Sequence, residues 1–144
     1  MYRFITMSVT ALNHSACSRI EGFVREALGC ACPPGVFGDI RLETGPDSFP
    51  DIPGARLLAI GGRLLLLLVD TDAADMDAGR ISVLLERGRV LRDAGGFNRF
   101  RLVIASPALA ATEPGNAPGG DDRLHLHRIA TSQLPDLLRA PEVQ

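Results

Sequence analysis

The residues best suited to chemistry in this chain are its cysteines and histidines, which fall into three close groups. These groups are His14 with Cys17, Cys30 with Cys32, and His125 with His127. Thiolates and imidazoles are the preferred ligands of zinc and of iron centres. The spacing therefore predicts a zinc or iron site built on Cys30 and Cys32, which His125 and His127 would complete if the fold brings the two pairs together. The alternative is that these cysteines and histidines are structural.

The two histidines near the C-terminus flank a single leucine. In a strand, alternate side chains share a face, and two residues of strand rise separate the imidazoles of His125 and His127 by about 6.8 Å. Two imidazoles so placed can share a metal ion. The competing interpretation is a solvated strand face.

Cys17 is the candidate nucleophile. It falls in the first turn of the helix expected over residues 15–28, where the helix macrodipole favours a thiolate, and His14 lies three residues earlier. The alternative is a small buried residue, the common fate of free cysteine. A continuous helix would also hold Cys17 roughly 20 Å from Cys30, since each residue adds about 1.5 Å, so one ion could not join them within one molecule.

Arginines are concentrated between residues 87 and 101. Five of them, with Asp93 as the one acid among them, occupy this stretch: Arg87, Arg89, Arg92, Arg99 and Arg101. Guanidinium groups match phosphate and carboxylate geometry, so Arg92, Arg99 and Arg101 are candidates for binding an anionic ligand. The alternative is pairing with the chain's own acids, such as Asp70 and Asp72, or with those of a second subunit.

All fifteen cationic residues are arginine, because the chain contains no lysine. This excludes a pyridoxal phosphate Schiff base, a Walker A loop and the kinase strand lysine. No Gly-x-Gly-x-x-Gly run is present, so the dinucleotide fingerprint is missing as well. The formal net charge of −2 makes nucleic acid and a membrane surface poor partners.

Length and composition indicate a single soluble domain. The chain has 144 residues, 46% hydrophobic and 22% charged. Its longest apolar run, residues 64–69, is far shorter than the ~20 residues that span a bilayer. The odd number of cysteines does not form a disulfide framework, and His14 stands where a signal-peptide cleavage site needs a small or aliphatic residue. We therefore expect a reduced, cytoplasmic protein.

The elements that must position these residues follow from periodicity and turn chemistry. Apolar residues at helical spacing predict a helix over residues 15–28, capped by Asn13 or Ser15. Residues 36–42 alternate and predict a strand, and residues 44–54 predict a loop. Gly61-Gly62 between two apolar runs predicts a hairpin of residues 56–60 and 63–69, whose leucine-rich second strand should be central in its sheet.

The second half of the chain is expected to continue this alternation. A helix is predicted over residues 72–91, with Met76, Val83, Leu84 and Leu91 inward and with weak points at Gly79 and Gly88. Strands are predicted over residues 100–104 and 124–129, separated by a flexible loop over 107–122, and a short helix over 131–138. The fold class is thus α/β (α+β): one domain over residues 1–144 whose mixed sheet of about five strands has a central hairpin, with helices packed against it. Residues 1–12 are a first strand or a mobile lead-in.

The succession helix, three strands, helix, strand resembles the core of restriction-endonuclease-like domains and, in outline, profilin-like dimerisation modules. The nuclease resemblance implies a carboxylate on the first hairpin strand and an acid-x-Lys on the second, and the runs Arg56–Ile60 and Arg63–Leu68 contain neither. Residues 66–72 resemble the first motif of haloacid-dehalogenase-type phosphatases, which also require a downstream lysine. Two functions remain: a thiol- or metal-binding accessory protein, or a non-catalytic interaction or oligomerisation module.

Overall fold

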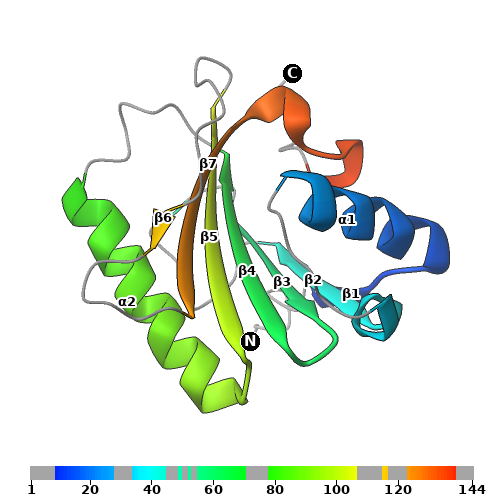
Figure 1. The fold of residues 1–144 in the computed structure, drawn as a ribbon, viewed down its shortest axis with the longest axis horizontal. Coiled ribbons are helices and arrows are strands. Elements are labelled where there is room, and N and C mark those ends of the chain that lie inside the picture. Colours follow the sequence, from blue (N-terminus) through cyan, green and yellow to red (C-terminus); the bar gives the residue numbers. More distant parts are fainter. Residues whose placement is uncertain are drawn as a thin grey trace, which may run out of the picture.

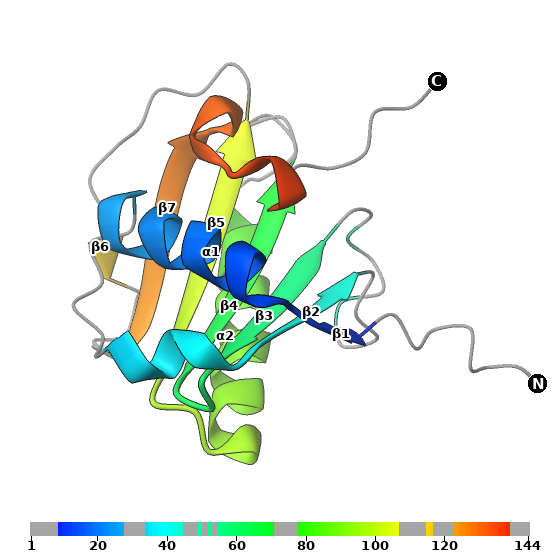
Figure 2. The same cartoon turned by 90° about the vertical axis from the view of Figure 1, so that its right-hand side faces the viewer.

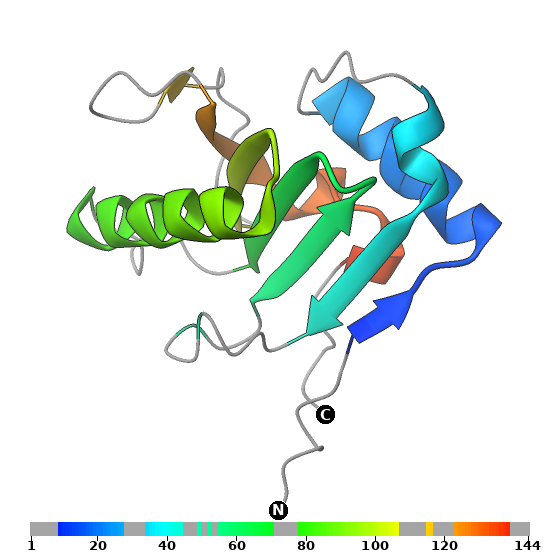
Figure 3. The same cartoon turned by 90° about the horizontal axis from the view of Figure 1, so that it is seen from below.

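The chain folds as a sheet with one long helix on each face, in the computed structural model shown in Figure 1. The structure describes residues 9–27, 34–44, 49, 52, 55–70, 78–106, 115–116 and 123–138. Helix α1 (His14–Ala27) covers one face and helix α2 (Ala78–Gly95) the other. Seen from below, the twisted sheet separates the two helices (Figure 3). The predicted α+β class, with helices packed on a mixed sheet, is confirmed.

Seven strands form the sheet in the order β1-β2-β3-β4-β5-β7-β6. Their bounds are β1 (Val9–Ala11), β2 (Ile40–Thr44), β3 (Arg56–Ile60), β4 (Leu64–Asp70), β5 (Arg99–Ser106), β6 (Gly115–Asn116) and β7 (Leu124–Ala130). The first four strands pair antiparallel, whereas β4, β5 and β7 are parallel. The two short strands, β1 and β6, lie at the edges, so five longer strands carry the sheet.

The central hairpin is the best-specified part of the fold. Gly61 and Gly62 have φ values of 62° and 69°, in the left-handed region that favours glycine. Arg63 N–H closes the turn by donating to the carbonyl of Ile60 at 3.0 Å. Every residue from Leu64 to Val69 is buried, and β4 lies fourth among the seven strands. The prediction of a central leucine strand covered on both faces is confirmed.

Alternation along the strands divides the apolar residues between two cores. The core on the α2 side includes Leu65, Leu67, Phe100 and Leu102, together with Phe49 and Ile52 from the predicted 44–54 loop. The core on the α1 side contains side chains from both helix and sheet, among them Ile20, Phe23, Leu58, Leu66 and Val103. β4 and β5 contribute to both cores.

Helix α1 forms as predicted. The Oδ1 of Asn13 accepts the N–H of Ala16 at 2.9 Å, which satisfies one of the donors that the first turn leaves without a helical partner. Figure 2 shows α1 crossing in front of the sheet, with the 3₁₀ segment η2 (Pro34–Gly38) beside it. The strand predicted over residues 36–42 is wrong in its first half, because residues 34–38 wind as this 3₁₀ helix and the strand begins at Ile40.

Helix α2 also differs from its prediction. Residues 71–77, which include Met76, lie outside the described part, and the helix continues past residue 91 to Gly95. Val83, predicted to point inward, is 49% exposed, whereas Ile81, Leu84 and Leu85 face the sheet. The helix runs unbroken through Gly88, and the ring of Phe100 occupies the space where a β-carbon at this position would stand.

The C-terminal part turns back over the α1 side of the sheet as two 3₁₀ turns, η4 (Thr131–Gln133) and η5 (Asp136–Leu138), in place of the predicted short helix. Leu134 and Leu138 are buried in the α1-side core. Of the predicted 107–122 loop, Gly115–Asn116 pairs with β7, and residues 107–114 and 117–122 lie outside the described part. Within the described ranges, no helix combines the length and apolar character needed to cross a membrane.

Candidate functional site

Four of the residues singled out by their chemistry meet on the α1 face of the sheet. On β5, Phe100 and Leu102 point toward α2, so Arg99 and Arg101 point the other way. On β7, Leu124 packs on the α2 side, which places His125 and His127 on the same face as the two arginines. Because β5 and β7 are neighbours, these four side chains form one cluster, which we call the Arg–His ladder.

Each arginine of the ladder contacts one histidine of the neighbouring strand. Arg99 Nη1 lies 3.1 Å from Nε2 of His125, and Arg101 Nη1 lies 2.8 Å from Nε2 of His127. A guanidinium is always a donor, so each Nε2 accepts the bond and the proton of the neutral imidazole resides on Nδ1. The two imidazole centroids are 6.5 Å apart. The ladder thus contains two cations and a defined tautomer at each histidine.

Burial deepens along the ladder. Arg99 and His125 are half-buried, whereas Arg101 is 8% exposed and His127 is 2% exposed. Burial, then the charge of Arg101, and last the proximity of His125 lower the pKa of His127 to about 3. Burial and the like charge of Arg99 also lower the pKa of Arg101. A positive charge thus acts on each of the two buried groups, Arg101 and His127, and the alternative of a solvated histidine face is wrong for His127.

Of the four predicted metal ligands, the structure describes two, His125 and His127. Their imidazoles share a face, and their Nε2 atoms, the usual metal ligands, receive bonds from arginines. Cys30 and Cys32, the other two predicted ligands, lie outside the described residues. Within the part of the chain that the structure describes, no group of three or more His, Cys, Asp or Glu side chains is arranged to hold a metal ion.

The third arginine of the predicted anion site lies elsewhere. Arg92 belongs to the sheet-facing side of α2, is 3% exposed, and donates from Nε to Asp93 at 3.0 Å. The sheet therefore stands between Arg92 and the ladder. The structure brings Arg99 and Arg101 together and separates Arg92 from them.

Cys17 lies in the α1-side core. It is 5% exposed, and its Sγ donates to the carbonyl of Leu12 at 3.6 Å. His14, its predicted assistant, is exposed at the first position of α1. A thiol that is buried and donates to a carbonyl has the environment of a packing residue, in which access of a substrate is blocked.

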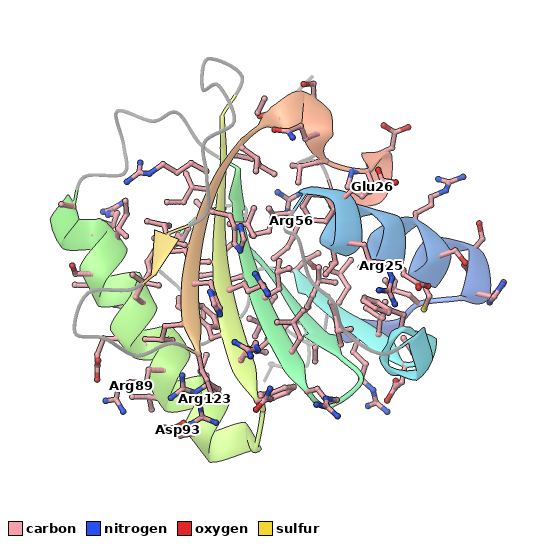
Figure 4. All side chains as sticks on the ribbon, viewed as in Figure 1. Arg25, Glu26, Arg56, Arg89, Asp93 and Arg123 are labelled. Carbon is pink, nitrogen blue, oxygen red and sulfur yellow. The ribbon has the colours of Figure 1, made fainter. Side chains whose placement is uncertain are left out.

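Sequence reasoning missed Arg56, a second buried guanidinium site on the α1 face. Arg56 is 4% exposed and donates from Nη1 to the carbonyl of Leu138, joining β3 to the last 3₁₀ turn. Figure 4 shows Arg56 between the sheet and α1, and Arg25 on α1 itself. The guanidinium of Arg25 lies 5.1 Å from the ring centroid of Phe37. Strand alternation could have predicted the burial of Arg56, since Arg56 shares a face of β3 with the buried Leu58 and Ile60.

The observed order of α1, β2-β3-β4, α2 and parallel β5 retains the succession that resembles restriction-endonuclease-like domains. That resemblance requires acids and a lysine on β3 and β4, whereas β3 carries no acid, and β4 carries only Asp70, at its last position. Searches against protein-family models, curated proteins and solved structures give no match to this chain.

Proposed function

We propose that this protein is a binding protein for a small oxyanion or carboxylate, which it holds at the Arg–His ladder. One observation carries the proposal: two guanidinium groups and two imidazoles share one face of β5 and β7, where the charge of Arg99 lowers the pKa of the buried Arg101 and the charge of Arg101 lowers that of His127.

Electrostatics favours an anion at this place. A guanidinium remains charged, and burying like charges side by side is costly unless an opposite charge compensates them. The ladder holds Arg99 and Arg101 two residues apart on one face, with Arg101 almost fully buried. A bound anion would offset this repulsion in surroundings where screening by water is weak.

The burial gradient indicates where the anion would bind. Arg99 and His125 are reachable from solvent, while Arg101 and His127 lie behind them. Direct hydrogen bonds would therefore come from Arg99, whose planar fork suits the paired oxygens of phosphate or carboxylate. Arg101 would contribute charge from the interior.

Calorimetric titration with inorganic phosphate, and separately with acetate, tests the proposal. We expect saturable binding that weakens with added sodium chloride and that falls about tenfold or more in Arg99→Gln, since a charged hydrogen bond contributes about 1.5–3 kcal/mol. Arg41→Gln is the matched control, because Arg41 is an exposed arginine of β2 and the substitution removes the same charge. Equal binding by both variants, or no saturable binding of either anion, would refute the proposal.

The cysteines and histidines leave a second candidate function, a zinc or iron site that uses the same imidazoles with Cys30 and Cys32. The observation that favours it is the pair of imidazoles 6.5 Å apart on one face, and a metal ion there would displace Arg99 and Arg101 from the two Nε2 atoms. Elemental analysis of protein purified without chelator discriminates between the two functions. Stoichiometric zinc or iron that is lost in Cys30→Ser/Cys32→Ser would favour the metal site, and its absence would leave the anion site.

A further inference from the structure

Helix α2 has a second apolar surface, on the side away from the sheet. Val83 and Val90 are 49% and 52% exposed, the large hydrophobic side chains with the greatest exposure among the described residues. They are seven residues apart, so they lie within about 20° of each other around the helix. Ala94, also exposed, continues the same stripe one turn further on. We call Val83, Val90 and Ala94 the outer stripe.

A hollow beside the outer stripe can receive a side chain. It has a volume of about 250 Å³ and is lined by Glu86, Arg87, Val90 and Leu91. Val83 and Val90 are one heptad apart, and the hollow adjoins Val90, so this side of α2 offers a small apolar contact to a second helix. The opposite side of α2 is already occupied by the sheet, through Ile81, Leu84 and Leu85.

Charges flank the outer stripe in an ordered way. At 100° per residue, Arg80 and Arg87 fall on one side of the stripe, and Glu86 and Asp93 fall on the other. Glu86 accepts a bond from Arg89 Nε at 3.1 Å, and Arg89 Nη1 lies 3.5 Å from Asp93, so the acids form a row held by one arginine. Figure 4 shows Arg89 and Asp93 along the lower part of α2.

The order of charges beside the outer stripe distinguishes a parallel from an antiparallel pairing of α2 with the α2 of a second copy. In a parallel two-fold pair, the cationic side of each helix meets the acidic side of the other. Arg87 of each copy then lies level with Glu86 of the other, so the symmetry gives two such contacts. In an antiparallel pair, Arg87 would meet the partner's Arg87 and Glu86 the partner's Glu86. The charges therefore favour the parallel pair and oppose the antiparallel one.

We propose that α2 is a self-association surface through which two copies of this chain pair in parallel about a two-fold axis along the helix. Val83 and Val90 each contact the same residue of the partner, and Arg87 of each copy pairs with Glu86 of the other. The two sheets lie on the outside of the pair, and the Arg–His ladder faces away from it, because the ladder occupies the face that α2 does not cover.

Charge reversal tests the proposal through a pattern that a general loss of stability cannot imitate. Sedimentation equilibrium over a range of concentrations should show a monomer–dimer equilibrium for the natural chain. Glu86→Arg alone, and Arg87→Glu alone, each place like charges at both contacts and should weaken dimerisation by at least about tenfold. An equimolar mixture of these two variants should dimerise, because every contact between them is again opposite in sign.

Sedimentation equilibrium also provides the controls and the outcomes that would contradict the proposal. Asp39→Arg and Arg41→Glu reverse exposed charges outside α2 and should leave dimerisation unchanged. Circular dichroism should show that all variants retain the fold. A natural chain that remains monomeric at the highest attainable concentration would overturn the proposal. So would two variants that dimerise separately, or a mixture that does not dimerise.

Discussion

At the scale of single residues, the Arg–His ladder fixes the protonation of its histidines. A guanidinium that donates to Nε2 requires that nitrogen to be unprotonated, and burial opposes a second proton elsewhere on the ring. His127 is affected most, since Arg101 lies 2.8 Å from its Nε2 and water is almost excluded. Burial, and after it the charge of Arg101, lowers the pKa of His127 to about 3.

The lowered pKa of His127 predicts that acid destabilises the fold through this residue. The unfolded chain binds a proton at His127 below its ordinary pKa of 6.5, whereas the folded chain does so only near 3. Stability should therefore fall as the pH drops between these values, by up to about 1.4 kcal/mol per pH unit. Urea unfolding at several pH values should show this slope in the natural chain and a shallower one in His127→Gln. Equal slopes would contradict the prediction.

Removing one partner of the buried contact should cost more than removing both. Arg101→Met leaves Nε2 of His127 buried without its donor, and we expect a loss of about 1–3 kcal/mol in the free energy of unfolding. Arg101→Met/His127→Leu replaces both polar groups with apolar ones and should recover part of that loss. A double-mutant cycle from urea unfolding measures the coupling, and strictly additive losses would show that the two side chains do not act as a pair.

The residues of the Arg–His ladder could be predicted from the sequence, but the contact between the arginines and the histidines could not. Alternation alone places Arg99 with Arg101, and His125 with His127, on one face of each strand. Which strands are neighbours depends on the parallel pairing of β5 with β7, which involves residues more than twenty positions apart. Arg92 is the opposite case. Its proximity in sequence to Arg99 led to the prediction that both belong to one anion site, but the sheet separates the two side chains.

At the scale of elements, the packing of α2 on β5 depends on a glycine that sequence reasoning treated as a weakness. A β-carbon at Gly88 would stand 2.1 Å from Cε2 of Phe100, a distance that forbids any side chain there. The glycine thus allows the helix to approach the sheet closely. Helix propensity alone predicts a break at this position, and tertiary contact with a buried aromatic ring overrides it.

Gly88→Ala should accordingly be destabilising despite the better helix propensity of alanine. We expect a loss of about 1–3 kcal/mol, the usual cost of overpacking a core. Gly22→Ala in α1 is the matched control, since its β-carbon would have no neighbour within 4 Å, and it should stabilise by roughly 0.5–1 kcal/mol. Thermal unfolding of both variants decides the question. A stabilised Gly88→Ala protein would mean that α2 does not approach Phe100 so closely.

Two other elements show why local pattern predicts some boundaries and not others. The Gly61-Gly62 turn was predictable because positive φ at both positions is required locally. The strand predicted over residues 36–42 was wrong in its first half because residues 34–38 wind as a 3₁₀ helix that buries Phe37, a tertiary contact. Val83 was misplaced because α2 carries apolar residues on both of its sides, and periodicity does not say which side meets the sheet.

At the scale of the whole molecule, one sheet joins two apolar cores, and the C-terminal turns complete the core on the α1 side. Leu138 is fully buried, and its carbonyl accepts a bond from the buried Arg56. The last turn is thereby fastened to β3, whose position in the sequence is 82 residues away. Since β4 and β5 contribute to both cores, disruption of one core should lower the stability of the whole fold.

Leu138→Ala should therefore lower the stability of the entire domain in a single cooperative transition, and not merely loosen its C-terminus. We expect a loss of about 2–5 kcal/mol, as for other fully buried leucines. Leu42→Ala, at a partly buried leucine against the same core, should cost less. Urea unfolding followed by circular dichroism measures both. A loss below that of Leu42→Ala would show that the C-terminal turns are peripheral.

The measurement that tests the anion site most directly is the imidazole ¹⁵N NMR spectrum of His127 as a function of pH, with and without inorganic phosphate. Without phosphate, His127 should remain neutral with its proton on Nδ1 well below the ordinary histidine pKa. Bound phosphate should raise the pKa of His127, because its negative charge offsets that of the arginines, and Arg99→Gln should abolish this response. A His127 that titrates near 6.5 without phosphate, or that ignores phosphate at every pH, would contradict the proposed site.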